Sequence, residues 1–262
     1  MNSGRYGHHR SFAVSLALRA GAIMKKNFTI GMRKEWKSDD TPLTKTDSAI
    51  NDLAITEIHK CFPGYGVISE EGSSFHNEEY VWVCDPVDGT TPFSHGYPLF
   101  MFSLALVKNG RPVLGVLFDP ILERLVVAGR NEGAFLNDKL VKIPETVSLV
   151  RALVSVDDIL PHWHFNDLRD VLKKEGCILP NLACLTYSCF LVALGEFAGA
   201  VWHGKTPWDG AAVQIIMEEA GGICTDVRGF TQRYDREING VVVGNKHIHS
   251  RLIEMIKETH SF

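Results

Sequence analysis

The chain has 262 residues, 45% of them hydrophobic and 22% charged, and its formal net charge is −4 at pH 7. This size and balance predict one globular domain over residues 1–262 with a sizeable hydrophobic core. The weakly negative charge offers no basic surface to a polyanion, so a small molecule is a better candidate ligand than nucleic acid.

No apolar run approaches the length of a membrane-spanning helix, and the first ten residues lack the apolar core of a signal peptide. The six cysteines form no CxxC pair, which fits buried thiols better than a zinc site or a disulfide framework. We therefore expect a cytoplasmic protein that has no membrane partner.

Two amphipathic helices are predicted in the first third of the chain. Apolar residues recur at helical spacing from Phe12 to Ile23 and again from Ile50 to Ile58. The segment 37–47 between them is rich in loop-forming residues and brings Asp47 to the start of the second helix.

Short strands dominate the next part of the chain, at 67–69, 80–84, 102–107, 113–118 and 125–128, with Asn109-Gly110 as a hairpin signal. After about residue 150 strands at 153–156, 198–202 and 241–243 alternate with helices near 164–174, 186–196, 208–220 and 247–257. This order predicts two lobes, an α+β lobe with an antiparallel sheet over about 1–145 and an α/β lobe over about 146–262.

Carboxylates stand at the ends of several of these elements. Glu70 follows the first strand, Asp85 ends the apolar strand 80–84, Asp88 comes three residues later, and Asp209 opens a helix. Pro86 is expected to end the strand ladder and turn the chain, which would fold Asp85 and Asp88 toward one point.

Carboxylates held this close repel one another unless a cation or a shared proton compensates their charge. Oxygen ligands without a nearby histidine or cysteine favour Mg²⁺ or Mn²⁺. The following Gly89-Thr90-Thr91 supplies backbone N–H groups that could hold a phosphate. Each feature alone fits a turn or a helix cap, but their joint occurrence favours phosphoryl chemistry at a metal.

Two other interpretations of the motifs are less favoured. The pairs His162/His164 and His247/His249 lack partner ligands in the sequence and are expected on the surface. An aspartate-nucleophile phosphatase would place its two acids two residues apart, whereas Asp85 and Asp88 are three apart. A water molecule activated by metal is the better nucleophile.

Two stretches of the chain carry a family resemblance. The segment 82–93, which contains Asp85-Pro-Val-Asp88-Gly-Thr-Thr, and the segments 208–212 and 219–222 resemble the two signatures of the inositol monophosphatase family of Mg²⁺-dependent, lithium-sensitive phosphatases. The resemblance runs over nearly the whole chain. It implies a layered αβαβα sandwich of the α+β class, a phosphoric monoester hydrolase activity and, as in many relatives, a homodimer.

The resemblance also assigns roles to particular residues. It implies that Glu70, Asp85 and the carbonyl of Val87 bind one Mg²⁺, and that Asp85, Asp88 and Asp209 bind a second, within a site for two or three ions. Further roles that it implies are orientation of the attacking water, by Asp47, Thr90 and Glu70, and binding of phosphate, by Gly89, Thr90 and Thr91.

The substrate side differs from the inositol-specific pattern. Ala183-Cys184-Leu185 stands where those relatives have Gly-Thr-Ala or Gly-Ser-Ala, and Trp202 or His203 replaces the acid that holds ring hydroxyls. The stretches 96–100 and 110–115 are similar to the branch that hydrolyses histidinol phosphate.

The expected substrate is therefore a small phosphorylated polyol, sugar or amino alcohol, with histidinol phosphate or a fructose bisphosphatase-type sugar phosphate as alternatives to inositol phosphate. A nucleotide such as phosphoadenosine phosphate would need a nucleobase pocket that the sequence does not identify. A regulatory or scaffold protein that binds a macromolecular partner is the alternative from another class.

Overall fold

The computed structural model describes residues 6–31, 34–37, 42–74, 79–158 and 165–260. Its helices are α1 Gly7–Asn27, α2 Lys45–Cys61, α3 Thr90–His95, α4 Asn166–Lys174, α5 Leu185–Ala193, α6 Pro207–Glu219 and α7 Lys246–Thr259. Its strands are β1 Glu35–Trp36, β2 Pro42–Leu43, β3 Gly66–Ser69, β4 Tyr80–Asp88, β5 Met101–Lys108, β6 Arg111–Asp119, β7 Arg124–Gly129, β8 Gly133–Leu136, β9 Lys139–Val141, β10 Val154–Asp158, β11 Gly199–His203, β12 Ile223–Thr225 and β13 Val241–Gly244.

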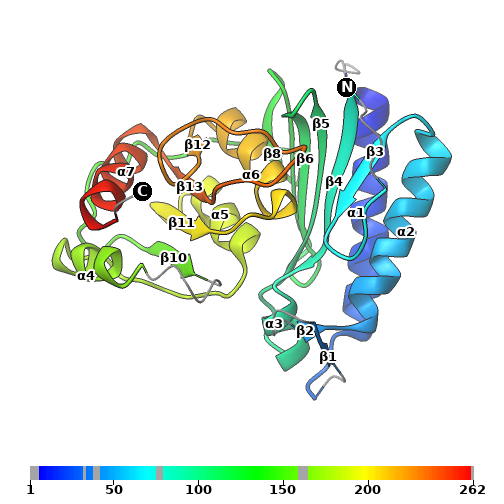
Figure 1. The fold of residues 1–262 in the computed structure, drawn as a ribbon, viewed down its shortest axis with the longest axis horizontal. Helices are drawn as coiled ribbons and strands as arrows, with labels where there is room; N and C mark the ends of the chain where they lie inside the picture. Colours follow the sequence, from blue (N-terminus) through cyan, green and yellow to red (C-terminus); the bar gives the residue numbers. More distant parts are fainter. Residues whose placement is uncertain (1–5, 32–33, 38–41, 75–78, 159–164, 261–262) are drawn as a thin grey trace.

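These elements form five layers (Figure 1). Helices α1 and α2 cover the outer face of a seven-stranded sheet whose strands follow the chain order from β3 to β9. Helices α5 and α6 lie between this sheet and a four-stranded sheet of order β10-β11-β13-β12. Helices α4 and α7 form the last layer. The arrangement confirms the predicted αβαβα sandwich.

The alternation of side chains along each strand builds the layers. On β4, Trp82 and Cys84 pack into the core beneath α1 and α2, whereas Val81 and Val83 pack into the central core with α5 and α6. Both faces of this strand are therefore apolar, and the sequence of the strand is a continuous hydrophobic run. A third core lies between the four-stranded sheet and helices α4 and α7.

The prediction that Pro86 ends the ladder of β4 is wrong. The strand continues to Asp88, which pairs with Met101, and the register shifts between Asp85 and Asp88. A bulge of this kind accommodates a proline because the bulged residues make no ladder hydrogen bond. The bulge, and not a turn, sets the positions of the two carboxylates.

The hairpin between β5 and β6 is confirmed, with φ of 49° at Asn109 and 80° at Gly110. The hairpin between the short strands β8 and β9 was not predicted. Asn137 and Asp138 form its turn, with φ of 44° and 67°. Two consecutive residues that tolerate positive φ are the signal that predicts such a turn.

The later helices and strands lie within a few residues of their predicted positions, but strand β12 was missed. The expectation that His249 lies on the surface is wrong, because the residue is buried on α7 beside Thr225. His162 and His164 lie outside the described residues. Within the part of the chain that is described, no helix is long and apolar enough to cross a membrane.

Candidate active site

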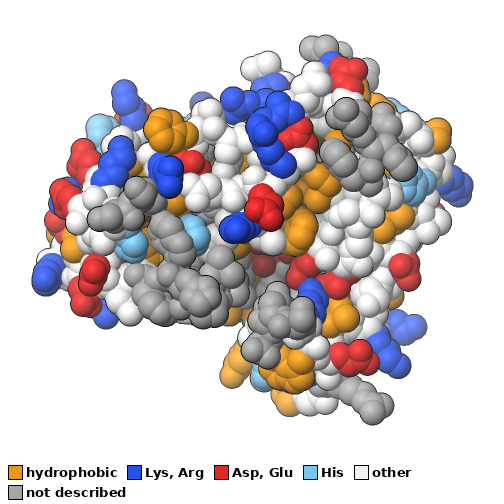
Figure 2. Space-filling view, viewed as in Figure 1, with side chains coloured by type: hydrophobic (Ala, Val, Ile, Leu, Met, Phe, Trp, Pro, Cys, Tyr) orange, Lys and Arg blue, Asp and Glu red, His pale blue; other side chains and the backbone are white. Residues whose placement is uncertain are grey.

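A cavity of about 340 Å³ opens between the two sheets, at the end of β4 and the start of α6. Figure 2 shows acidic side chains gathered in the hollow at the middle of this face. The cavity is lined by Pro42, Glu70, Asp85, Val87, Asp88, Gly89, Thr90, Thr91, Asp157, Asn181, Ala183, Trp202, His203, Gly204, Lys205, Thr206, Trp208 and Asp209. Most of the residues singled out in the sequence therefore share one cavity.

Three carboxylates form the centre of the cavity. Asp85, Asp88 and Asp209 each offer an oxygen, and these atoms all lie within 4.8 Å of one another. Burial raises the pKa of each carboxyl; the charge of the neighbouring acids raises the pKa of Asp85 and of Asp209 further, whereas hydrogen bonds from Thr186 oppose the rise at Asp88. The donor set is made of oxygens only and carries excess negative charge, so it fits a hard divalent cation such as Mg²⁺.

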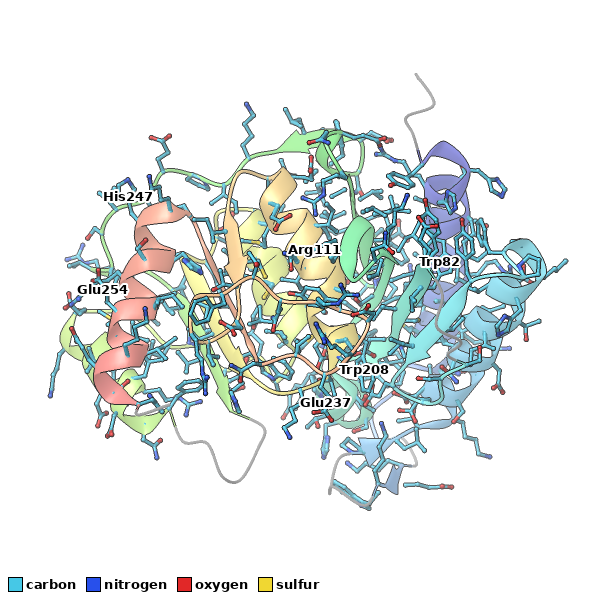
Figure 3. The ribbon with its side chains drawn as sticks, turned by 45° about the horizontal axis from the view of Figure 1, so that its top comes forward. Trp82, Arg111, Trp208, Glu237, His247 and Glu254 are labelled. Carbon is cyan, nitrogen blue, oxygen red and sulfur yellow. The ribbon has the colours of Figure 1, made fainter. Side chains whose placement is uncertain are left out.

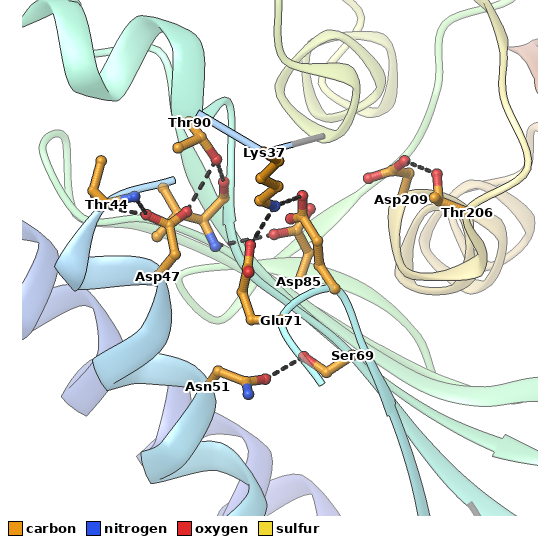
Figure 4. Close-up of polar contacts among 12 residues, drawn as sticks. Lys37, Thr44, Asp47, Asn51, Ser69, Glu71, Asp85, Thr90, Thr206 and Asp209 are labelled. Atoms are coloured by element: carbon orange, nitrogen blue, oxygen red, sulfur yellow. Dashed lines mark hydrogen bonds and ion pairs between the residues drawn. The ribbon is translucent and has the colours of Figure 1, made fainter. Parts of the chain in front are cut away.

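Hydrogen bonds from two threonines hold two of these acids in place. Thr186 at the start of α5 donates its backbone N–H at 2.6 Å and its hydroxyl at 2.5 Å to Asp88 Oδ2. Thr206, the N-cap of α6, donates its hydroxyl to Asp209 (Figure 4). Neither threonine was predicted as a site residue, although Thr206-Pro-Trp-Asp209 has the spacing of a helix capping box.

Asp47 lies in the first turn of α2 and is almost completely buried. Its Oδ2 accepts hydrogen bonds from Thr44, from the backbone N–H at 2.9 Å and from the hydroxyl. Its Oδ1 faces Thr90, whose hydroxyl oxygen lies 3.0 Å away and also 2.9 Å from the carbonyl oxygen of Val87 (Figure 4). Burial raises the pKa of Asp47. The capping box of α2 thus aims one carboxylate oxygen at the site.

A lysine of the loop 37–47 that was not predicted as a site residue lies beside the acids of the site. Lys37 Nζ lies 2.7 Å from Glu70 Oε1 and also donates a hydrogen bond to Glu71. Burial raises the pKa of Glu70 although the lysine charge opposes this shift. The same two carboxylates raise the pKa of Lys37, against the effect of its own burial. Its ammonium group compensates part of the negative charge of the site.

Gly89 connects β4 to α3 in a conformation that only glycine adopts readily. Its φ is 86°, and a Cβ atom there would lie 2.6 Å from the carbonyl oxygen of Leu99 and 3.0 Å from Cβ of Cys184. The backbone of 88–90 can therefore pass close to α5. Gly89, Thr90 and Thr91 line the cavity beside the carboxylates.

Of the four residues predicted on the substrate side, three line the cavity and one does not. Ala183, Trp202 and His203 line the cavity, whereas Cys184 is buried with its sulfur 3.2 Å from Asp88 Oδ2. Cys184 therefore contacts an acid of the centre and does not line the cavity.

Several lining residues were not predicted from the sequence, among them Asp157, Asn181 and Lys205, whereas Trp208, which opens the second family signature, also lines the cavity. Figure 3 places Trp208 between the two sheets, at the start of α6. Asp157, Asn181 and Lys205 belong to no short motif, so the sequence offered no signal for them.

Comparison with known proteins agrees with this fold. The model of the inositol monophosphatase family matches residues 8–261. Inositol-1-monophosphatase of Mesorhizobium japonicum is 30% identical, with 94% of each chain covered. The Aquifex aeolicus protein named fructose-1,6-bisphosphatase/inositol-1-monophosphatase is also 30% identical, with 92% of each chain covered. The structure of the inositol monophosphatase from Anabaena superposes with a TM-score of 0.84 at 26% identity, with 96% of each chain covered.

The layered sandwich and these relatives define the protein as a phosphoric monoester hydrolase. Within this class, the chain belongs to the inositol monophosphatase family.

Proposed function

We propose that the protein hydrolyses a small phosphate monoester, an inositol phosphate or a related polyol or sugar phosphate, with Mg²⁺ as its cofactor and a water molecule as the nucleophile. One observation carries the proposal. The oxygens of Asp85, Asp88 and Asp209 converge within 4.8 Å in the cavity that also contains Thr90, whose hydroxyl meets Asp47. A cation site and a proton acceptor therefore lie side by side.

We assign Glu70, Asp85 and the carbonyl of Val87 to one Mg²⁺, and Asp85, Asp88 and Asp209 to a second; a third ion, or Mn²⁺ in place of Mg²⁺, is part of the same proposal. Held by these residues, Mg²⁺ would lower the pKa of the attacking water and would stabilise the negative charge that develops on the leaving oxygen. Thr186 and Thr206 keep Asp88 and Asp209 oriented toward the proposed cation position. Lys37 places a positive charge beside Glu70, which supports the proposal that the carboxylates of this site bind cations.

Thr90 and Asp47 have the geometry of a proton relay. The Thr90 oxygen can accept the proton of the attacking water while its own proton passes to Asp47 Oδ1, 3.0 Å away. The raised pKa of Asp47 favours this acceptance. Glu70, at the same cavity, helps to orient the water. The water oxygen forms the new bond to phosphorus, and the bond from phosphorus to the alcohol oxygen breaks. The leaving oxygen takes up a proton from solvent and Asp47 returns its proton to solvent, so the products are inorganic phosphate and the alcohol.

The turn after β4 supplies the phosphate site. The first N–H groups of a helix have no acceptor inside the helix, and the residues Gly89, Thr90 and Thr91 line the cavity. We assign their backbone N–H groups to the non-bridging phosphate oxygens. The positive φ of Gly89 supports this assignment because it allows the turn to approach a ligand closely.

A sugar bisphosphate is a second candidate substrate, and the name of the Aquifex aeolicus relative, which includes fructose-1,6-bisphosphatase, favours it. Histidinol phosphate remains the candidate for an amino alcohol. We further propose a cytoplasmic homodimer. The absence of a disulfide among the six cysteines supports a reducing location, and light scattering of the purified protein tests the dimer.

The test is a phosphate-release screen with Mg²⁺ over inositol, histidinol, fructose, glycerol and adenosine phosphates. We expect turnover of at least one polyol or sugar phosphate, loss of turnover with a chelator, and recovery when Mg²⁺ is added again. The variant Asp88→Asn keeps the volume of the side chain and removes its charge, so kcat should fall by about a hundredfold or more.

The variant Asp52→Asn, at an exposed position of α2, is the matched control for the loss of one carboxylate. If no phosphate is released from any substrate by the folded protein with Mg²⁺, the proposal fails. A scaffold function would then be favoured.

A further inference from the structure

The first turn of α5 is hydrogen-bonded to two strand ends of the seven-stranded sheet. Thr186 donates to Asp88 at the end of β4, and the next residue, Tyr187, donates its hydroxyl at 3.1 Å to Asp119 Oδ2 at the end of β6. Both strand ends lie at the same end of the sheet, because the first residues of β5 pair with each of them. Helix α5 is therefore attached there at an acid of the proposed cation site and at a second, fully buried acid.

Asp119 is a fixed anchor for Tyr187. Its Oδ1 accepts the backbone N–H groups of Ile121 and Leu122, at 2.9 Å and 3.1 Å, in the turn between β6 and β7. Its Oδ2 accepts two hydrogen bonds from Arg124, at 2.7 Å from Nη2 and 3.1 Å from Nε. Both carboxylate oxygens are thus held by the β6–β7 segment itself, so the acid keeps its place independently of α5.

The Tyr187 hydroxyl both accepts and donates a hydrogen bond in this cluster. It accepts from Arg124 and donates to Asp119. Burial raises the pKa of Tyr187 to about 12, so the hydroxyl keeps its proton near pH 7. The Arg124 guanidinium also lies 5.4 Å from the ring centre of Tyr187 and 4.9 Å from that of Phe190, further along α5. The Asp119–Arg124–Tyr187 cluster therefore holds the first turn of α5 from the side of the sheet.

We infer that Tyr187 is a positioning residue that acts on the cation site through Thr186. The cluster fixes the turn in which Thr186 lies, and the backbone N–H and hydroxyl of Thr186 then orient Asp88. Residues that hold a metal ligand without touching the ion tune the affinity of the site, often by about 10–100-fold. The inference rests on the proposed function, because it takes Asp88 as a ligand of the cation.

The test is Tyr187→Phe, which removes the hydroxyl and keeps the ring and the ion pair between Arg124 and Asp119. The probe is Mn²⁺ without substrate, and electron paramagnetic resonance measures the free ion. We expect the dissociation constant to rise about threefold or more, a smaller factor than for a direct partner of a ligand. The Mg²⁺ concentration for half-maximal phosphate release should rise by the same factor. Arg124→Lys keeps the charge without the planar fork and should weaken binding in the same direction.

Tyr234→Phe is the matched control. Tyr234 is fully buried in the same core as Tyr187, but its hydroxyl lies 3.3 Å from Gln232 Nε2 and 3.9 Å from Cys224 Sγ. This variant should keep the Mn²⁺ affinity of the unmodified protein even if its melting temperature falls. An equal loss of affinity in the two variants would show that any buried hydroxyl of this core has the effect, and would overturn the inference.

A double-mutant cycle with Thr186→Val tests the route to the site. Thr186→Val deletes the hydroxyl at nearly constant volume and should weaken Mn²⁺ binding about tenfold or more. In this background Tyr187→Phe should have a clearly smaller effect than in the unmodified protein, because the two residues act in series. Full additivity, or an unchanged affinity in Thr186→Val, would overturn the route through Thr186.

The inference and the proposed function fail in different ways. Unchanged Mn²⁺ affinity in Tyr187→Phe and Arg124→Lys, with melting curves that show folded proteins, would overturn the inference and leave the proposed function intact. Failure of the unmodified protein to release phosphate in the substrate screen would instead overturn the proposed function, whatever the variants bind.

Discussion

The hydroxyl oxygen of Thr90 lies 3.0 Å from Asp47 Oδ1, although 43 positions separate the two residues. The contact joins the first turn of α2 to the first turn of α3, across the edge of the seven-stranded sheet. Each residue is held from its own side. Thr44 fixes Asp47, and the carbonyl of Val87 fixes Thr90. The pair is therefore set in place before a substrate binds.

Removal of the Thr90 hydroxyl should reduce turnover without preventing metal binding. We expect Thr90→Val to lower kcat by about a hundredfold, the scale of general base catalysis, because the water loses its proton acceptor. Thr90→Ser keeps the hydroxyl and should retain activity within about tenfold. Steady-state kinetics over a range of Mg²⁺ concentrations measures both effects. Equal losses in the two variants would contradict the relay.

Alanine substitutions at Gly89 and Gly221 separate the cost of a steric clash from the cost of backbone strain. Both have a positive φ, 86° and 88°, but an added Cβ meets the Leu99 carbonyl oxygen at 2.6 Å at position 89 and nothing within 4 Å at position 221. Gly221→Ala should cost about 1 kcal/mol from strain alone, and Gly89→Ala about 3 kcal/mol or more together with most of the activity. Urea unfolding and phosphate release measure the difference. Similar costs at the two positions would argue against a tightly packed turn at Gly89.

Mg²⁺ should stabilise the folded protein by mass action. At a concentration about 100 times its Kd, one bound ion adds about 2.7 kcal/mol, which raises the melting temperature by roughly 5–10 °C in a chain of this size. Asp88→Asn should lose most of this increase, and Asp52→Asn should keep it. A melting curve that does not respond to millimolar Mg²⁺ would contradict the site.

The burial of His249 predicts a loss of stability in mild acid. Its pKa is lowered from 6.5 to about 4 by burial on α7, so below pH 6.5 the unfolded chain binds a proton that the folded protein does not. The free energy of unfolding contributed by this group therefore falls as the pH falls from about 6.5 toward 4, by about 2 kcal/mol between pH 7 and 5. Urea unfolding at the two pH values measures it. His249→Gln should remove this part of the pH dependence, and an unchanged dependence would exclude His249 as its source.

Local patterns in the sequence were enough to predict six of the seven described helices, most of the longer strands and the acids that converge in the cavity, but not the short helix α3. Hydrophobic periodicity is a local property, and the strongly apolar run before Asp85 left little choice of structure for β4. The spacing of Asp85, Asp88 and Gly89 is also local, so the motif could be recognised before the fold was known. Short strands such as β8, β9 and β12 were missed because three or four residues carry too little periodicity.

The way these elements meet depends on contacts between distant parts of the chain. The neighbours of Pro86 in the sheet, and not its own preference, settle whether β4 continues through a bulge. The polar segment around His249 suggests a surface position, but the packing of α7 on the four-stranded sheet buries the residue. Asp157 reaches the active-site cavity only because β10 pairs with β11 in register. Contacts between distant parts of the chain have no local signature, so side chains that depend on them become visible only in the folded molecule.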